Sequence, residues 1–330
     1  MDTLRSLAVA SIIANNTPMI GLPDKLSSYI DKIAKAQRAV AVGKMSLSDV
    51  PEECRLRATC LMAISNCGGD VLEFVPEEIM SYDLCMKAMS KNGHFFSRVP
   101  EKYKTADMCL AAVSNAEWIF PTLSTAMQAE ICLSAAIRNG AVLYYLSREQ
   151  KTQEVCLAAV SGCGWVLEEV PYEVMSNDIC LAAVCQDGDA IRYVPEDYMT
   201  EEICMEAVID NGNNLRFVPD AYMSEDICME AVYNDGDALQ YVPLDYMSED
   251  ICMEAVRNDG EALQYVPEDY MSDEVCIAAI QETEEAAKYV PECKLQRLLC
   301  LITLRDTKKV LGDLKNAMGQ IWVGLMDQTH

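Results

Sequence analysis

A cysteine recurs about every 24 residues through most of this 330-residue chain. Eleven cysteines follow one another at intervals of 25, 24, 23 and then seven times 24 residues: Cys60, Cys85, Cys109, Cys132, Cys156, Cys180, Cys204, Cys228, Cys252, Cys276 and Cys300. An alanine follows three residues after each of the first ten, eight units carry a glycine eight residues after the cysteine, and most units close with Val-Pro. Periods of about 20–50 residues are typical of proteins in which each repeat packs on its neighbours. The register therefore predicts a solenoid.

The segment from Ser248 to Pro267 shows how one unit is expected to fold. Ser248 stands where a helix N-cap belongs. Apolar residues follow at i, i+1, i+4 and i+5, on one face of a helix: Ile251, Cys252, Ala255 and Val256. Gly260 is expected to end this helix in the left-handed conformation. Leu263 and Val266, spaced i and i+3, predict a second, short helix that Pro267 terminates.

These units predict an all-α fold, an α-solenoid of about ten 24-residue helix-turn-helix repeats with helical caps at both ends. Residues 1–45 are expected to form an N-terminal helical cap, 46–300 the repeat solenoid, and 301–330 a C-terminal amphipathic capping helix. The N-terminal cap contains a predicted helix over 24–42, with Ile30, Ile33 and Gln37 on one side. A leucine-rich repeat, with a strand at Ala-Leu-Gln-Tyr-Val, is the alternative that the period allows.

The frame I/V-C-x-x-A-V-x-x-x-G-x-x-L-x-x-V-P over about residues 45–300 resembles short helical repeats catalogued as a domain of unknown function. Such repeats occur in effector-like proteins of intracellular bacteria and in proteins of giant DNA viruses. The resemblance implies an all-helical fold and work inside a cell, in the cytoplasm of a host in the effector case. It supplies no catalytic residues. It also permits a second role, as a building block of a larger assembly such as a virion.

A second, shorter resemblance lies near the N-terminus. Leu22-Pro23-x-x-Leu26-x-x-x-Ile30 is similar to the start of an F-box, the helix that binds a ubiquitin-ligase adaptor. That similarity implies a substrate adaptor for a ubiquitin ligase. Proline in the first turn of any amphipathic helix gives the same pattern, so both interpretations stay open at this point.

The net negative charge is confined to one part of the chain. Residues 168–290 hold 31 acidic and 4 basic side chains, whereas the remainder holds 21 acidic and 22 basic ones. So acidic a surface repels phosphate backbones and anionic membranes, which argues against nucleic acid or membrane as partner. Complementary charge speeds and orients association. We therefore expect another protein as partner, docked through a basic segment.

Repetition places acids and tyrosines in columns along residues 168–290. The candidate partner-binding residues are Glu206, Glu230 and Glu254, then Asp197, Asp245 and Asp269, then Tyr198, Tyr222, Tyr246 and Tyr270. A second aromatic column comprises Tyr193, Phe217, Tyr241, Tyr265 and Tyr289. The competing interpretation is a solvated acidic face with tyrosines covering the seams between repeats. A methionine stripe, Met205, Met229 and Met253, is more simply explained as filling such a seam.

The cysteine ladder predicts packing rather than chemistry. Equivalent positions on stacked helices lie about 8–10 Å apart, beyond the ~7 Å that a disulfide allows between α-carbons. Buried cysteine behaves as a small hydrophobic residue, and we expect reduced, buried thiols. The Asn-Asp-Gly-Asp stretch at 234–237 lacks the alternating ligands and distal glutamate of a calcium loop. No metal and no cofactor is predicted.

Segment 109–156 departs from the frame. It is one residue short, has Glu117 where other units have glycine, and holds Trp118 and the pair Tyr144 and Tyr145. Irregularity within a regular array often marks function, so this segment is the alternative site, including for an enzyme. Against catalysis stand only two histidines, no phosphate-binding glycine loop and no nucleophile motif. We therefore expect a non-enzymatic interaction scaffold.

Overall fold

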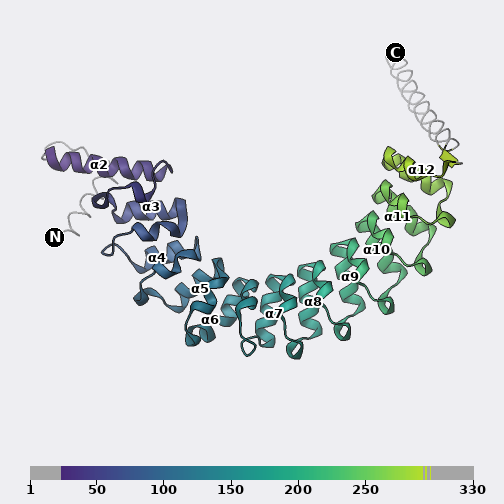
Figure 1. The fold of residues 1–330 in the computed structure, drawn as a ribbon, viewed down its shortest axis with the longest axis horizontal. Helices are drawn as coiled ribbons and strands as arrows, with labels where there is room; N and C mark the ends of the chain where they lie inside the picture. The colour runs from purple at the N-terminus through teal and green to yellow at the C-terminus, as the bar shows by residue number, and fades with distance from the viewer. Residues whose placement is uncertain (1–23, 293, 296–297, 299–330) are drawn as a thin grey trace, which may run out of the picture. The chain divides into compact units, whose positions relative to one another are not determined.

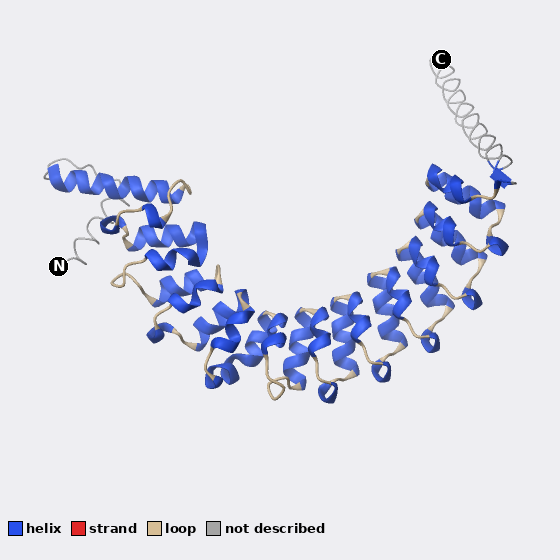
Figure 2. Ribbon diagram, in the orientation of Figure 1, coloured by secondary structure: helices blue, strands red, loops and turns tan. Residues whose placement is uncertain are grey.

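The structure is a computed structural model that describes residues 24–292, 294, 295 and 298, and all regular elements in that part are helices (Figure 2). The described residues contain no strand, so the leucine-rich alternative is wrong for them, and the all-α solenoid is confirmed. None of the described helices combines the length and the apolar character needed to cross a membrane.

The chain divides into two compact units, residues 1–175 and 176–330. In each unit the α-helices lie side by side in chain order (Figure 1). The first unit contains the α-helices α2 (Asp24–Ala41), α3 (Arg57–Cys67), α4 (Tyr82–Met89), α5 (Ala106–Asn115), α6 (Thr125–Arg138) and α7 (Gln153–Gly162). Its 3-10 helices are η1 (Leu47–Asp49), η2 (Glu52–Cys54), η3 (Gly68–Phe74), η4 (Gly93–Arg98), η5 (Glu101–Tyr103), η6 (Glu117–Thr122), η7 (Gly140–Tyr145), η8 (Gly164–Glu169) and η9 (Tyr172–Val174).

The second unit repeats one pattern of three helices. Its α-helices are α8 (Asn177–Gln186), α9 (Glu201–Asp210), α10 (Glu225–Asn234), α11 (Glu249–Asn258) and α12 (Asp273–Glu282). A longer 3-10 helix follows each: η10 (Gly188–Tyr193), η12 (Gly212–Phe217), η14 (Gly236–Tyr241), η16 (Gly260–Tyr265) and η18 (Glu284–Tyr289). Three-residue 3-10 turns complete the repeats: η11 (Glu196–Tyr198), η13 (Asp220–Tyr222), η15 (Leu244–Tyr246) and η17 (Glu268–Tyr270).

The predicted N-cap at the start of the α-helix is confirmed in the repeats of the second unit. The Ser248 hydroxyl accepts a hydrogen bond from the Ile251 N–H at 3.3 Å, which satisfies one of the unpaired donors in the first turn of α11. The first-turn acids Glu249 and Asp250 favour the same end through the helix dipole. The predicted second short helix is also present, as a 3-10 helix of six residues.

Each repeat contributes to two layers of helices. Neighbouring α-helices pack on each other, neighbouring long 3-10 helices pack on each other, and each of α9 to α12 also contacts the 3-10 helix of the preceding repeat. The core between the layers contains the predicted apolar face of the α-helix. In α11 these four side chains are fully buried: Ile251, Cys252, Ala255 and Val256.

The prediction that the repeat glycine ends the α-helix in the left-handed conformation is wrong. Among the described glycines only Gly43 has a positive φ. Asp259 ends α11 in an extended conformation and its carboxylate accepts from the Glu261 N–H at 2.8 Å, so it caps the 3-10 helix. Gly260 is required for a different reason: a Cβ there would lie 2.5 Å from the carbonyl oxygen of Ala279 in the next repeat.

Asparagine side chains tie successive repeats together at the same place. The Asn258 amide accepts from the Gly236 N–H at 2.9 Å and donates to the Tyr233 carbonyl at 2.6 Å, both in the preceding repeat. Asn234 donates to the Val208 carbonyl in the same way, at 3.0 Å. Where the repeat glycine brings two successive repeats close together, the asparagine side chains therefore pair the backbone N–H and C=O groups, as burial of polar groups requires.

The predicted helix at 24–42 corresponds to α2, whose buried residues include Ile30, Ile33 and Gln37. Gly43, at φ 70°, follows its end. Leu22 and Pro23 of the F-box-like start lie outside the described residues, as do the predicted C-terminal capping helix at 301–330 and Cys300.

The ten described ladder cysteines are buried, between 0 and 7% exposed. Because the thiolate is the reactive form, we expect these thiols to resist iodoacetamide in native buffer, whereas the exposed Cys185 reacts. Peptide mass spectrometry before and after denaturation measures this. Native alkylation of Cys228 as fast as that of Cys185 would contradict the packing role.

Candidate protein-docking surface

The structure places the sequence-predicted residues on two different elements of the repeat. Glu206, Glu230 and Glu254 lie in α9, α10 and α11 and are half-buried. The methionines that precede them are half-buried too. Burial, and then the carboxylates of Glu206 and Glu202, raise the pKa of the Cys185 thiol, which places these acids next to the preceding α-helix. Glu206 therefore lies at the seam between α8 and α9, and Glu230 and Glu254 occupy the equivalent repeat positions in α10 and α11.

The other predicted columns lie on the three-residue turns. The aspartates of these turns are exposed: Asp197, Asp245 and Asp269. The tyrosines beside them are half-buried at the ends of the turns: Tyr198, Tyr222, Tyr246 and Tyr270. The predicted partner-binding residues are therefore divided between the α-helices and the three-residue turns that precede them in the chain.

A third surface brings acids and aromatic rings together, and sequence reasoning missed its acids. We call it the acid–tyrosine face and define it by the long 3-10 helices of the second unit. Its acids directly follow the repeat glycine: Asp189, Asp237 and Glu261. Its rings end the same helices: Tyr193, Phe217, Tyr241, Tyr265 and Tyr289. The rings are half-buried, and so are the three acids.

The last repeats show how an acid and a ring of this face are combined. The Tyr289 hydroxyl donates to the Glu261 carboxylate at 3.5 Å, from one repeat to the preceding one. Lys288 pairs with the same carboxylate at 3.3 Å, and its ammonium lies 4.6 Å from the centre of the Tyr289 ring. The ammonium thus has an ion pair and a cation–π contact together.

Arginines occupy comparable positions at the other end of the face. Arg192 pairs with Asp189 at 3.1 Å, and its guanidinium lies 5.5 Å from the centre of the Phe217 ring. Arg216 lies 4.7 Å from the same ring centre. The face therefore binds cationic side chains of its own chain in three repeats.

The middle of the face is different, because Asp237 lies among further acids and has no lysine or arginine of its own in the described part of the chain. Burial, and then the carboxylates of Asp259, Asp235 and Glu261, raise the pKa of Asp237. The pKa of Tyr265 is raised as well. Burial is the largest cause, and the Asp237 carboxylate and the neighbouring tyrosines are the next ones. Within the described residues Asp237 forms no ion pair.

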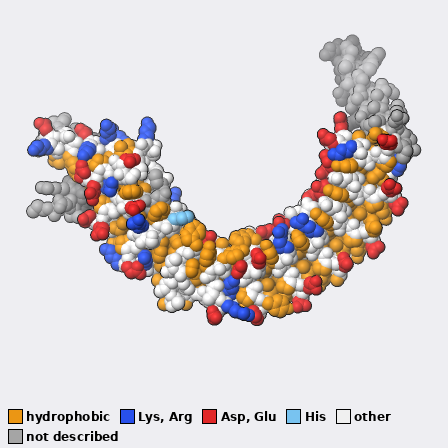
Figure 3. Space-filling model, in the orientation of Figure 1, with side chains coloured by type: hydrophobic (Ala, Val, Ile, Leu, Met, Phe, Trp, Pro, Cys, Tyr) orange, Lys and Arg blue, Asp and Glu red, His pale blue; other side chains and the backbone are white. Residues whose placement is uncertain are grey.

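The space-filling view agrees with this charge distribution. In Figure 3, Asp and Glu side chains lie along the visible side of the second unit with hydrophobic patches and few Lys or Arg between them, while side chains of both charges are mixed over the first unit.

The irregular segment 109–156 does bring aromatic side chains to the surface. Trp118 is 40% exposed and lies edge-on to His94 of the preceding repeat, with ring centres 4.5 Å apart. Tyr144 stacks at a tilt on Trp165, 5.3 Å between centres. Tyr145 belongs to the same 3-10 helix as Tyr144 and is 38% exposed. The predicted residues thus join two separate aromatic pairs, Trp118 in one and Tyr144 in the other.

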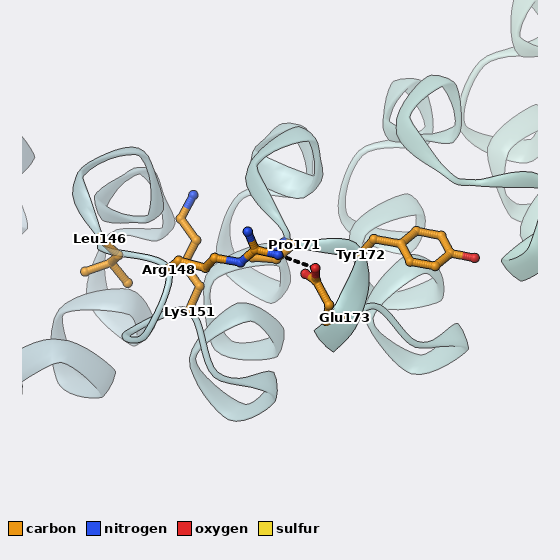
Figure 4. A pocket seen from close by; sticks show the side chains of 6 residues that line it. All are labelled: Leu146, Arg148, Lys151, Pro171, Tyr172 and Glu173. Carbon is orange, nitrogen blue, oxygen red and sulfur yellow. Dashed lines mark hydrogen bonds and ion pairs between the residues drawn. The ribbon is translucent and has the colours of Figure 1, made fainter.

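A pocket of about 390 Å³ adjoins this segment in the first unit (Figure 4). Its lining residues are Leu146, Arg148, Lys151, Pro171, Tyr172 and Glu173. Arg148 is paired with Glu173, and Tyr172 points away from that pair. Lys151 is paired with Glu169 at 2.9 Å and donates to the carbonyl of the same residue. The cations that line the pocket are therefore engaged within the chain.

A second groove of about 360 Å³ is lined by residues of α11 and α12 and includes Met253 of the methionine stripe. Across the described part of the chain, no three potential metal-ligating side chains come together.

Comparison with known families matches the second half of this repeat array. Four successive stretches, residues 152–199, 176–223, 200–247 and 248–293, match the model of a family described as "Domain of unknown function (DUF4116)". The matched range is part of the 45–300 region in which the sequence resembles such repeats. Neither the curated proteins nor the solved structures contain a match.

Proposed function

We propose that this protein is a non-enzymatic scaffold whose second unit binds a basic segment of another protein. The observation that carries the proposal is the charge of residues 168–290, 31 acidic against 4 basic side chains, on a repeated surface. A regular array presents the same chemistry at regular intervals, which suits an extended partner.

The acid–tyrosine face is the part of this surface that best fits such a partner. Exposed charge alone contributes more to association rate and orientation than to affinity. Aromatic side chains, by contrast, are common anchors in interfaces. Acids and rings in contact on consecutive 3-10 helices supply both contributions, as the contact of Tyr289 with Glu261 illustrates.

A designed peptide can test this proposal without knowledge of the natural partner. An extended chain rises about 3.3 Å per residue, so three residues span about 10 Å, close to the ~8–10 Å between stacked helices. We would use a fluorescent peptide of about 18 residues with arginine at every third position. Its control replaces each arginine with glutamine. Fluorescence anisotropy with the full chain measures binding at ~50 and ~300 mM salt.

Three charge-reversal variants of equal charge change then locate the site. The first changes Asp189, Asp237 and Glu261 to lysine, the second Glu206, Glu230 and Glu254, and the third Asp197, Asp245 and Asp269. We expect the first to weaken binding about tenfold or more and the others about two- to threefold. Higher salt should weaken wild-type binding markedly. Equal losses in all three variants would overturn the assignment to the acid–tyrosine face, and equal binding of the glutamine control would overturn the proposal itself.

The absence of catalysis is part of this proposal. It is supported by near-identical repeats in the second unit and by the engaged cations of the pocket in Figure 4, since an enzyme needs unlike groups converging on one pocket. The virion-component and ubiquitin-ligase-adaptor hypotheses stay predictions from the sequence.

A further inference from the structure

Three repeats of the acid–tyrosine face already contain a lysine or arginine against an aromatic ring. These cations occupy one repeat position, the residue before the ring that ends the 3-10 helix: Arg192, Arg216 and Lys288. In the two repeats between them this position is glutamine, Gln240 and Gln264. Comparing the filled repeats with these two shows which of them keeps the ring and the acid but lacks the cation.

The last repeat gives the filled form. Lys288 contacts the Tyr289 ring at 4.6 Å and pairs with Glu261 of the preceding repeat at 3.3 Å. Moving each residue back by one period of 24 gives Gln264, Tyr265 and Asp237. This set keeps the ring and the acid but replaces the cation with a neutral, exposed side chain.

The unfilled set at Tyr265 and Asp237 has further acids around it. Asp237 lies in η14 and Tyr265 in η16, and these two 3-10 helices pack on each other as η16 and η18 do where Glu261 meets Tyr289. Burial and then the Asp237 carboxylate raise the pKa of Tyr265, in agreement with this packing. Asp235 and Asp259 lie around Asp237, and each already uses one carboxylate oxygen to cap a 3-10 helix, at 3.0 and 2.8 Å. A cation arriving here would relieve the repulsion among these carboxylates.

We infer that Tyr265 and Asp237 form a niche that receives a lysine or arginine side chain of the partner, in the position that Lys288 fills one repeat later. The inference rests on the proposed function, because it names the chemistry of the docked residue. The neighbouring set one repeat earlier has Gln240 and Tyr241 with neutral Asn213 in place of the acid, so it lacks the ion-pair half of the niche.

That neighbouring repeat supplies a matched control. Gln264→Lys places a cation of the chain itself in the niche, while Gln240→Lys adds the same charge at the same repeat position one period away. With the arginine-repeat peptide, we expect Gln264→Lys to weaken binding about tenfold and Gln240→Lys about twofold or less. Far-ultraviolet circular dichroism confirms that both variants keep the helical fold.

A second pair removes the acid instead of adding a cation. Asp237→Asn should lose about tenfold in affinity, and Asp245→Asn, which removes the same charge from an exposed turn, about twofold or less. If both members of each pair lose equally while the charge reversal of Asp189, Asp237 and Glu261 still weakens binding more than the other two reversals do, the niche is wrong and the docking face stands. If wild type fails to bind the peptide at low salt, the proposed function and the niche both fall.

Discussion

Replacing Gly140 with alanine should destabilise the first unit by about 3 kcal/mol or more. A Cβ on Gly140 would lie 2.3 Å from the Ala159 carbonyl oxygen and 2.8 Å from the Cys163 Cβ, both in the next repeat. The nearest atom belongs to the backbone of an α-helix and cannot rotate away, so η7 and α7 have to separate. The midpoint of urea unfolding, followed by far-ultraviolet circular dichroism, measures the loss.

Gly162, at the end of α7, is the control for this substitution. It is exposed, its φ is not positive, and a Cβ there meets nothing within 4 Å. Alanine favours the helical conformation over glycine, so Gly162→Ala should leave stability unchanged or raise it by up to about 1 kcal/mol. Gly212→Ala, with the Ala231 oxygen at 2.2 Å, should repeat the loss in the second unit. Equal effects of Gly140→Ala and Gly162→Ala would show that the close approach between repeats is unimportant.

The glycine column also shows what sequence alone can and cannot predict about this fold. The 24-residue register, the N-cap serine and the buried face of the α-helix are local patterns, and the structure confirms each in α11. The role of Gly260 is not local, because the atom that excludes a side chain there belongs to Ala279 in the next repeat. Reasoning from one helix end alone gave the left-handed explanation, which is wrong.

A similar limit applies to the candidate site. Aligning repeats identifies which acids and tyrosines recur, but it does not show which columns are adjacent. Glu261 meets Lys288 and Tyr289, 27 and 28 residues later, so the contact depends on how two 3-10 helices stack. One signal was available in the sequence: the residue after the repeat glycine is acidic at Asp189, Asp237 and Glu261, whereas it is His94 or Trp165 in earlier repeats.

Raising the pH from about 8.5 towards 11 should unfold the protein cooperatively, and the ladder cysteines should be a main cause. Burial is the largest cause that raises the pKa of seven of these thiols to about 11: Cys60, Cys85, Cys156, Cys180, Cys204, Cys228 and Cys252. An unfolded thiol has a pKa of about 8.5. Below that pH both states keep the proton, and the stabilisation from burial is fully present.

Above about pH 8.5 the unfolded chain releases protons that the folded chain retains, so the free energy of unfolding falls as the pH rises towards the folded pKa. Each of the seven thiols contributes at most about 1.4 kcal/mol per pH unit in this window. Urea midpoints from pH 7.5 to 10.5, measured under reducing conditions, should therefore decline steeply. A triple variant with alanine in place of Cys204, Cys228 and Cys252 should have a lower urea midpoint than the wild type at pH 7.5, because the substitutions leave small cavities. Its urea midpoint should nevertheless decline less steeply as the pH rises. Since this variant keeps every tyrosine and lysine, parallel curves for it and the wild type would assign the alkaline unfolding to those residues instead of the thiols.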